Sequence, residues 1–214
     1  MIRKENMEAS ARKLVAYLLE EGLGGFGPLS SAENLAAEYV IDQDYRSNDH
    51  RVRSLINWET GKNFTSGFVT GLGGIITLPL SIPTALGASW LLQARLAGAI
   101  ARIYGHELDS DRVRTAVLLS LAGDGAKNAI KDAGIQLGRK LTQQAINQIP
   151  GRALVEINKT IGFRLVTKAG QRGILNLSKG IPVAGGLVGG SMDVMACRVV
   201  GRTAKMLFRP VESA

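Results

Sequence analysis

Residues 63–94 read NFTSGFVTGLGGIITLPLSIPTALGASWLLQA, a run of 32 positions without a charged side chain. Pro79 and Pro83 disfavour helical geometry at the residues before them, so we expect an irregular apolar loop from Ile75 to Ser81. A long helix should follow, with Pro83 in its first turn and Gly105 as its left-handed cap. The stretch therefore predicts a glycine- and proline-rich apolar hairpin that leads into a central helix.

The uncharged run is long enough to raise the question of a membrane span. Ile75 to Leu92 covers 18 residues, the length at which a span becomes a candidate, but seven of them are Thr, Ser, Pro or Gly. An unpaired Arg95 in the following helix would cost roughly 2.5–3.5 kcal/mol in lipid. A buried central helix, or a hairpin that enters one leaflet, is therefore favoured over a span. The candidate lipid contacts of such a hairpin are Ile75, Ile76, Leu78 and Leu80.

The rest of the chain also shows helical periodicity and no alternating strand pattern. The expected fold is all-α, a single bundle of about seven to eight helices around the hairpin. Serines at 30 or 31 and at 110 are expected N-caps, and one long helix is expected from about Asp124 to Ile149. The sequence GLGGFGP at residues 22–28 predicts a joint between an N-terminal helix, residues 1–27, and the main helical domain, residues 28–214.

A second glycine-rich apolar segment, GIPVAGGLVGGS, occupies residues 180–191. Glycines four positions apart form overlapping GxxxG pairs here, and another pair lies in the uncharged run. Small residues at this spacing leave a groove in which a second helix approaches closely. The predicted helix-packing glycines are Gly67, Gly71, Gly185, Gly186, Gly189 and Gly190.

The last predicted helix carries a narrow basic stripe on an otherwise apolar surface. At about 100° per residue, its four cations fall within about a 60° arc. The helix before it repeats the pattern with cations at four-residue steps. Such a stripe suits a helix that is buried on most sides, or one that lies at a membrane interface with its cations toward the headgroups. The candidate membrane contacts are Arg164, Lys168, Arg172, Arg198, Arg202, Lys205 and Arg209.

The charge distribution points to an anionic partner. The chain has a net charge of +8, and residues 125–180 alone hold ten basic and two acidic residues. Nucleic acid and acidic lipid headgroups are both compatible with this excess. The basic stretch contains a single aromatic residue, Phe163, and so lacks the stacking side chains common in single-strand binders. Nonspecific nucleic-acid binding is therefore the weaker alternative.

The sequence contains one acid that we expect to be buried and no catalytic motif. Asp193 lies about 140° from the basic stripe, so we expect it to be buried and to need a partner. It is either a structural group or the acid of a lipid-acting hydrolase in an apolar cleft. His50, His106 and Cys197 lack partners at metal-ligand spacing, and no nucleotide or nucleophile motif occurs. The sequence thus predicts no metal and no cofactor, and it favours binding over catalysis.

Several ordered motifs resemble one family. They are PLSSAENLAAEY at 28–39, GFVTGLGG at 67–74 with Pro79 and Pro83, NKTIGFRLVTKAG at 158–170, NLSKGIP at 176–182, and GGLVGG followed by Asp193 and VGRTA at 200–204. Over roughly residues 28–208 the chain is similar to the EcsC family, named for a protein encoded beside an ABC transporter. The resemblance implies a helical domain with membrane association and supplies no catalytic residues.

These features together predict an amphitropic, membrane-proximal interaction protein. Its basic helices would meet an anionic membrane surface or a membrane protein, an ABC transporter among the candidates, while the apolar hairpin inserts. The first residues, Met1 to Lys4, are basic, but Glu5 and Glu8 interrupt any apolar run after them, so a cleaved signal peptide is not expected. The expected location is the cytoplasm, peripherally at the inner face of the membrane.

Overall fold

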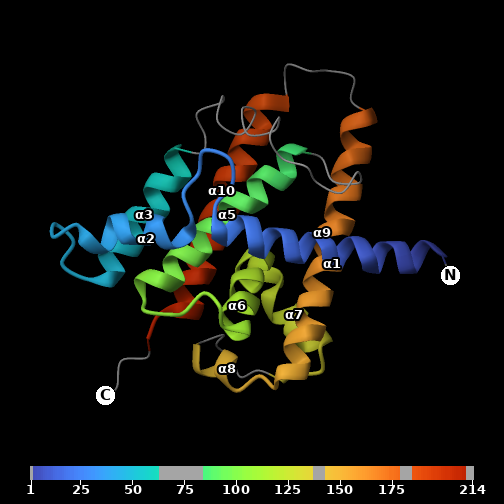
Figure 1. Cartoon of the computed structure of the whole chain (residues 1–214). Coiled ribbons are helices and arrows are strands. Elements are labelled where there is room, and N and C mark those ends of the chain that lie inside the picture. The colour runs from blue at the N-terminus through green and yellow to red at the C-terminus, as the bar shows by residue number, and fades with distance from the viewer. Residues whose placement is uncertain (1, 63–83, 137–142, 179–184, 211–214) are drawn as a thin grey trace.

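The described part of the chain is entirely helical (Figure 1). The structure, a computed structural model, describes residues 2–62, 84–136, 143–178 and 185–210, and of 2–4, 62, 84–85, 169–178 and 185–193 only the backbone. Its elements are α1 Ile2–Gly24, α2 Ala32–Ile41, α3 Asn48–Lys62, α5 Thr84–Ile103, α6 Asp111–Ala122, the 3-10 turn η1 Gly123–Gly125, α7 Ala126–Asp132, α8 Gln143–Asn147, α9 Gly151–Ser178 and α10 Gly185–Phe208. The all-α prediction is confirmed.

Helix α5 is the centre of the bundle. Every residue from 86 to 101 is buried, and the helix packs against α1, α2, α3, α6 and α10. A helix that is apolar on all sides is stable in water only when other elements cover every face. Gly105, two residues after the end of α5, has a φ of +89°, as expected for a left-handed cap. The predicted central helix is thus confirmed as the core of the fold.

Helix packing in the described region depends on glycines that the GxxxG pattern did not indicate. A Cβ placed on Gly162 of α9 would lie 2.9 Å from the carbonyl oxygen of Ala11 on α1, and one on Gly22 of α1 would lie 2.7 Å from Cβ of Ala94 on α5. A Cβ on Gly201 of α10 would lie 2.8 Å from Cγ1 of Ile56 on α3. Figure 1 shows α1 crossing both α9 and α5. The absence of side chains at these crossings lets the backbones approach.

The helix expected from Asp124 to Ile149 is wrong as a single element. It is divided into η1, α7 and α8. Gly134, two residues beyond α7, has a φ of +80°. A residue in this left-handed conformation cannot continue a right-handed helix, and glycine adopts it without steric cost. The apolar spacing of the segment was helical, but it contained no information about this turn.

Several sequence predictions fall outside the described residues. The apolar loop with Ile75, Ile76, Leu78 and Leu80 lies there, as do Gly67 and Gly71. Gly185, Gly186, Gly189 and Gly190 lie on the described backbone of α10, but the surroundings of these glycines and the side chain of Asp193 are not described. Among the described helices, none has the length and apolar character needed to cross a membrane.

Substitution of Gly162 tests the close crossing of α1 and α9. Gly162→Ala should lower the free energy of unfolding by about 1–3 kcal/mol, because the new methyl group meets backbone that cannot move aside cheaply. Gly61→Ala is the matched control, since a Cβ on this helical glycine meets nothing within 4 Å. It should be neutral or stabilise by up to about 1 kcal/mol. Urea denaturation of both variants measures the difference, and equal stabilities would refute the close crossing.

Candidate functional site

Helix α10 presents one exposed face to solvent, which we call the α10 face and define as Met195, Arg198, Arg202 and Met206. Both arginines are exposed, and Met195 and Met206 are 69% and 45% exposed. Exposed methionines are uncommon on a soluble surface, where apolar side chains of this size usually pack inside. Within the described residues no ion pair reaches either arginine. The α10 face therefore combines accessible cations with accessible apolar side chains.

The other two cations of the predicted stripe have a structural partner. Lys205 Nζ lies 3.2 Å and Arg209 Nη2 3.3 Å from Oδ2 of Asp49, near the start of α3. The hydroxyl of Tyr104 donates a hydrogen bond of 2.7 Å to the other oxygen of the same carboxylate. Asp49 thus joins the end of α10 to α3 and to the residue after α5. Four cations share one side of the helix, but only two of them are directed to solvent without an acidic neighbour in the described structure.

The pKa of Asp49 reflects this cluster. Burial by itself raises the pKa, but the hydrogen bonds from Tyr104 and Lys205, together with the charges of Lys205 and Arg209, outweigh burial and hold it below the ordinary value of 3.8. The carboxylate is therefore ionised throughout the physiological range, and its charge is compensated locally.

The cations of α9 differ from one another in their surroundings. Arg164 donates hydrogen bonds of 2.9 Å to the carbonyl oxygen of Gly125 and 2.7 Å to Oδ2 of Asp132. It therefore fastens α9 to η1 and α7. Lys168, one turn further on, is exposed and lines a cavity. The side chain of Arg172 lies outside the described residues.

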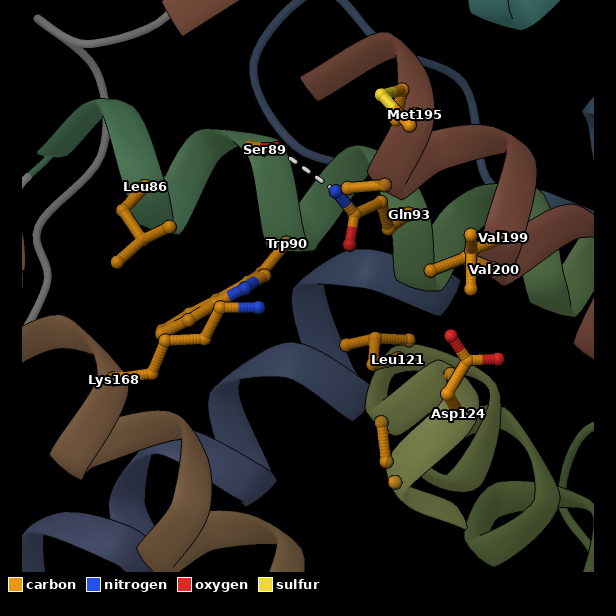
Figure 2. Close-up of a pocket in the computed structure, with 14 residues that line it drawn as sticks. Leu86, Ser89, Trp90, Gln93, Leu121, Asp124, Lys168, Met195, Val199 and Val200 are labelled. Atoms are coloured by element: carbon orange, nitrogen blue, oxygen red, sulfur yellow. Dashed lines mark hydrogen bonds between the residues drawn. The ribbon is translucent and has the colours of Figure 1, made fainter. Parts of the chain in front are cut away.

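The cavity has a volume of about 260 Å³ and lies between α5, α6, η1, α9 and α10. Its wall is mixed, with apolar side chains that include Leu86 and Trp90 from α5, Leu121 from α6, and Met195 and Val199 from α10. Figure 2 shows Lys168 reaching toward Trp90 at one side, and Asp124 on the other side. Ser89 and Gln93 contribute buried polar atoms from α5. Sequence reasoning identified Lys168 but not this cavity, because the lining residues come from distant segments.

The family assignment follows from comparison with known proteins. A model of the EcsC protein family matches residues 23–210. The chain belongs to the EcsC protein family. No curated protein and no solved structure matches it. In this EcsC-family protein the matched region includes α2 to α10, so both the α10 face and the cavity lie within the part of the chain that the family shares.

The core of the EcsC domain contains a charged pair. Arg95 of α5 and Glu59 of α3 are 5% and 3% exposed, and Arg95 Nη1 lies 3.4 Å from Oε2 of Glu59. Arg95 also donates 2.6 Å and 2.8 Å hydrogen bonds to the carbonyl oxygen and the hydroxyl of Ser30. The adjacent Ser31 caps α2 by accepting a hydrogen bond from the amide of Asn34, which confirms the predicted cap. The charge of Arg95, which would be costly to bury in lipid, is thus paired and hydrogen-bonded within the protein.

Among the described residues, His106 lies far from the backbone position of Asp193, the acid of the predicted hydrolase alternative. His106 lies 2.8 Å from the carbonyl oxygen of Phe208, the last residue of α10. Asp193 lies fifteen residues earlier on the same helix, about 22 Å along its axis. His50 is exposed and packs edge-on against Tyr45. The described side chains form no cluster of three or more groups able to hold a metal.

The Asp49 cluster predicts a pH-dependent contribution to stability. A carboxylate whose folded pKa is lowered stabilises the fold above its unfolded pKa, and this stabilisation disappears as the pH falls through the folded value. Asp49→Asn should therefore cost about 1–2 kcal/mol at pH 7. The difference between wild type and variant should shrink as the pH falls from about 4, the ordinary pKa of the unfolded carboxyl group, through the lower folded pKa. Urea unfolding at pH 7 and pH 3 measures both, and a difference that is unchanged between the two pH values would contradict the assignment.

The buried Arg95–Glu59 pair predicts strong coupling between two substitutions. Arg95→Met leaves a carboxylate buried without its counter-charge and should cost about 3–5 kcal/mol. The double variant Arg95→Met/Glu59→Leu removes both charges and should recover most of this loss. Chemical denaturation of wild type, Arg95→Met, Glu59→Leu and the double variant completes the double-mutant cycle. Additive losses would show that the two side chains do not interact.

Proposed function

We propose that this EcsC-family protein is an amphitropic, membrane-proximal protein that binds an anionic lipid surface through the α10 face. The observation that carries the proposal is the arrangement of Arg198 and Arg202 between the exposed Met195 and Met206. Cations flanked by apolar side chains on one helix face allow simultaneous contact with headgroups and with the acyl boundary. The proposed location is the inner face of a membrane, where anionic lipids concentrate.

The strength of this attachment follows from the exposed groups. Each cation near an anionic surface contributes about 1 kcal/mol, so Arg198 and Arg202 contribute about 2 kcal/mol. Partial burial of Met195 and Met206 adds roughly 1–1.5 kcal/mol each. The sum of about 4–5 kcal/mol corresponds to a partition constant of roughly 10³–10⁴ M⁻¹, similar to that of a single myristoyl chain. Such binding is reversible, and a membrane protein partner, an ABC transporter among the candidates, would strengthen it.

Lys205, Arg209 and Arg164 contribute less to the proposed contact. Asp49 compensates Lys205 and Arg209, and Asp132 compensates Arg164. The ordered acidic partners also reduce the net positive potential available to nucleic acid. The apolar members of the α10 face favour lipid further, because phosphate backbones offer no apolar surface at their edge.

Vesicle flotation tests the proposal directly. The double variant Arg198→Gln/Arg202→Gln should bind vesicles that contain anionic phosphatidylglycerol about thirty-fold more weakly than wild type at moderate salt, from about 2 kcal/mol lost. Arg12→Gln/Lys13→Gln is the matched control, since it removes two exposed charges from α1, which packs on α9 and α5. Its binding should fall much less.

The same experiment has outcomes that would reject the proposal. Absence of wild-type flotation with anionic vesicles at moderate salt, or an equal loss in both double variants, would remove the α10 face as a lipid contact. Retention of duplex DNA at physiological salt, with the same dependence on Arg198 and Arg202, would instead favour nucleic acid as the anionic partner.

A further inference from the structure

Helices α3 and α10 pack against each other in opposite directions (Figure 1). At one end of the contact, Nζ of Lys205 on α10 lies 3.2 Å from the carboxylate of Asp49 on α3. At the other end, the hydroxyl of Thr60 on α3 donates a 3.6 Å hydrogen bond to Sγ of Cys197 on α10. Residue numbers therefore rise along α3 where they fall along α10, and the pair is antiparallel.

Two positions on each helix are turned to the same solvent side of this pair. Ile56 of α3 and Gly201 of α10 face each other at the contact. A residue three positions before its contact residue is turned from it by about 60°, and a residue one position after it by about 100° in the same sense. Because the helices are antiparallel, this rotation leads to the same side of the pair on both. The four side chains at these positions, all exposed, form what we call the α3–α10 seam: Arg53, Asn57, Arg198 and Arg202.

The three arginines of the seam form no ion pair with an acid in the described structure. Nε of Arg53 donates a 3.2 Å hydrogen bond to the carbonyl oxygen of Asp49, one turn earlier on its own helix. Its two terminal nitrogens have no partner among the described residues. The guanidinium groups of the seam are therefore available to an anion from outside the protein.

The surroundings of Tyr104 place Arg53 beside the end of α10. Burial raises the pKa of the Tyr104 hydroxyl, and the hydrogen bond to Asp49 raises it further. The positive charges of Arg209 and Arg53 oppose this rise, so both guanidinium groups lie near the same hydroxyl. The contact register and this electrostatic effect agree that Arg53 faces the α10 side of α3.

The charge of the seam matches a phosphomonoester better than a phosphodiester. A phosphomonoester carries about −1.5 to −2 charges at pH 7 and three terminal oxygens that accept hydrogen bonds, whereas a phosphodiester carries a single charge and two such oxygens. Guanidinium groups bind phosphate through paired N–H donors, so three arginines and the amide of Asn57 supply more donors than a diester accepts. The exposed Met195 and Met206 beside two of these arginines favour a phosphate that belongs to a lipid.

We infer that the α3–α10 seam binds the phosphomonoester headgroup of a lipid, with Arg53 and Asn57 from one helix and Arg198 and Arg202 from the other. Packed helices have axes about 8–10 Å apart, and the pair approaches closely at Gly201, so arginines from both helices reach one phosphate. The inference rests on the proposed attachment of the α10 face to an anionic membrane, and it names the lipid class that this face selects.

Flotation with two kinds of vesicle tests the headgroup. Phosphatidic acid, a phosphomonoester, replaces phosphatidylglycerol at a mole fraction that gives the same surface charge. Wild type should bind the phosphatidic acid vesicles at least about tenfold more tightly, because their headgroup accepts more charge-assisted hydrogen bonds. Equal binding to both vesicles would overturn the phosphomonoester site and leave the α10 face as a general anionic contact. Absence of binding to either kind would reject the α10 face as well.

Arg53→Gln separates the seam from the α10 face. Its binding to phosphatidylglycerol should fall by no more than about fivefold, the effect of one cation, whereas its preference for phosphatidic acid should disappear. Arg152→Gln removes an exposed cation in the first turn of α9 and is the matched control, which should keep the preference. A preference that survives in Arg53→Gln would overturn the assignment of α3 to the site.

Asn57→Ala tests the seam without a change of charge. Its binding to phosphatidic acid should weaken by about fivefold, and its binding to phosphatidylglycerol should match wild type. An equal loss on both vesicles would contradict a role of Asn57 in headgroup selection.

Inorganic phosphate distinguishes a lipid headgroup from a free anion. Phosphate added to the phosphatidic acid vesicles should release no more protein than sulfate at equal ionic strength, because neither anion replaces the apolar contacts of Met195 and Met206. Selective release by phosphate, or saturable calorimetric binding of phosphate that Arg53→Gln abolishes, would make a soluble phosphate the ligand and overturn the lipid assignment.

Discussion

The burial of one guanidinium in the central helix is the constraint on which the arrangement of the bundle depends. Arg95 lies in the middle of α5, where every neighbouring position is covered, so its charge must be satisfied by protein groups. Glu59 of α3 and Ser30 before α2 supply them. These contacts hold α3 and the start of α2 against α5, and α3 in turn packs on α10. One buried charge thus fixes two of the elements that surround the central helix.

The position of α3 decides which cations of α10 remain available. Asp49 lies near the start of α3 and faces Lys205 and Arg209. Arg198 and Arg202 precede these two residues on α10 and stay exposed. A basic stripe that is uniform on a helical wheel is therefore divided in the fold into a structural half and an accessible half. Met195 links the accessible half to the cavity, because it belongs to both.

Local signals in the sequence were sufficient for much of the fold. The serine cap of α2, the central helix and its glycine stop at Gly105 were predictable, since each depends on residues a few positions apart. The division of the segment from 124 to 149 was not predictable from apolar spacing, because the left-handed turn at Gly134 leaves that spacing unchanged. The glycines at the described helix crossings were missed for a related reason. Gly22 and Gly162 are isolated along the chain, and only their neighbours in space reveal their role.

The sequence by itself determined an all-helical EcsC domain, a buried central helix and a cationic last helix, because periodicity, charge and capping act over one or two helical turns. Only the tertiary structure decided that Glu59 balances Arg95, that Asp49 compensates the charges of two cations of the basic stripe, and that Gln93, Lys168 and Asp124 line one cavity. Each of these arrangements brings together residues at least 31 positions apart. Their pairing follows from how the helices pack, which no local pattern encodes.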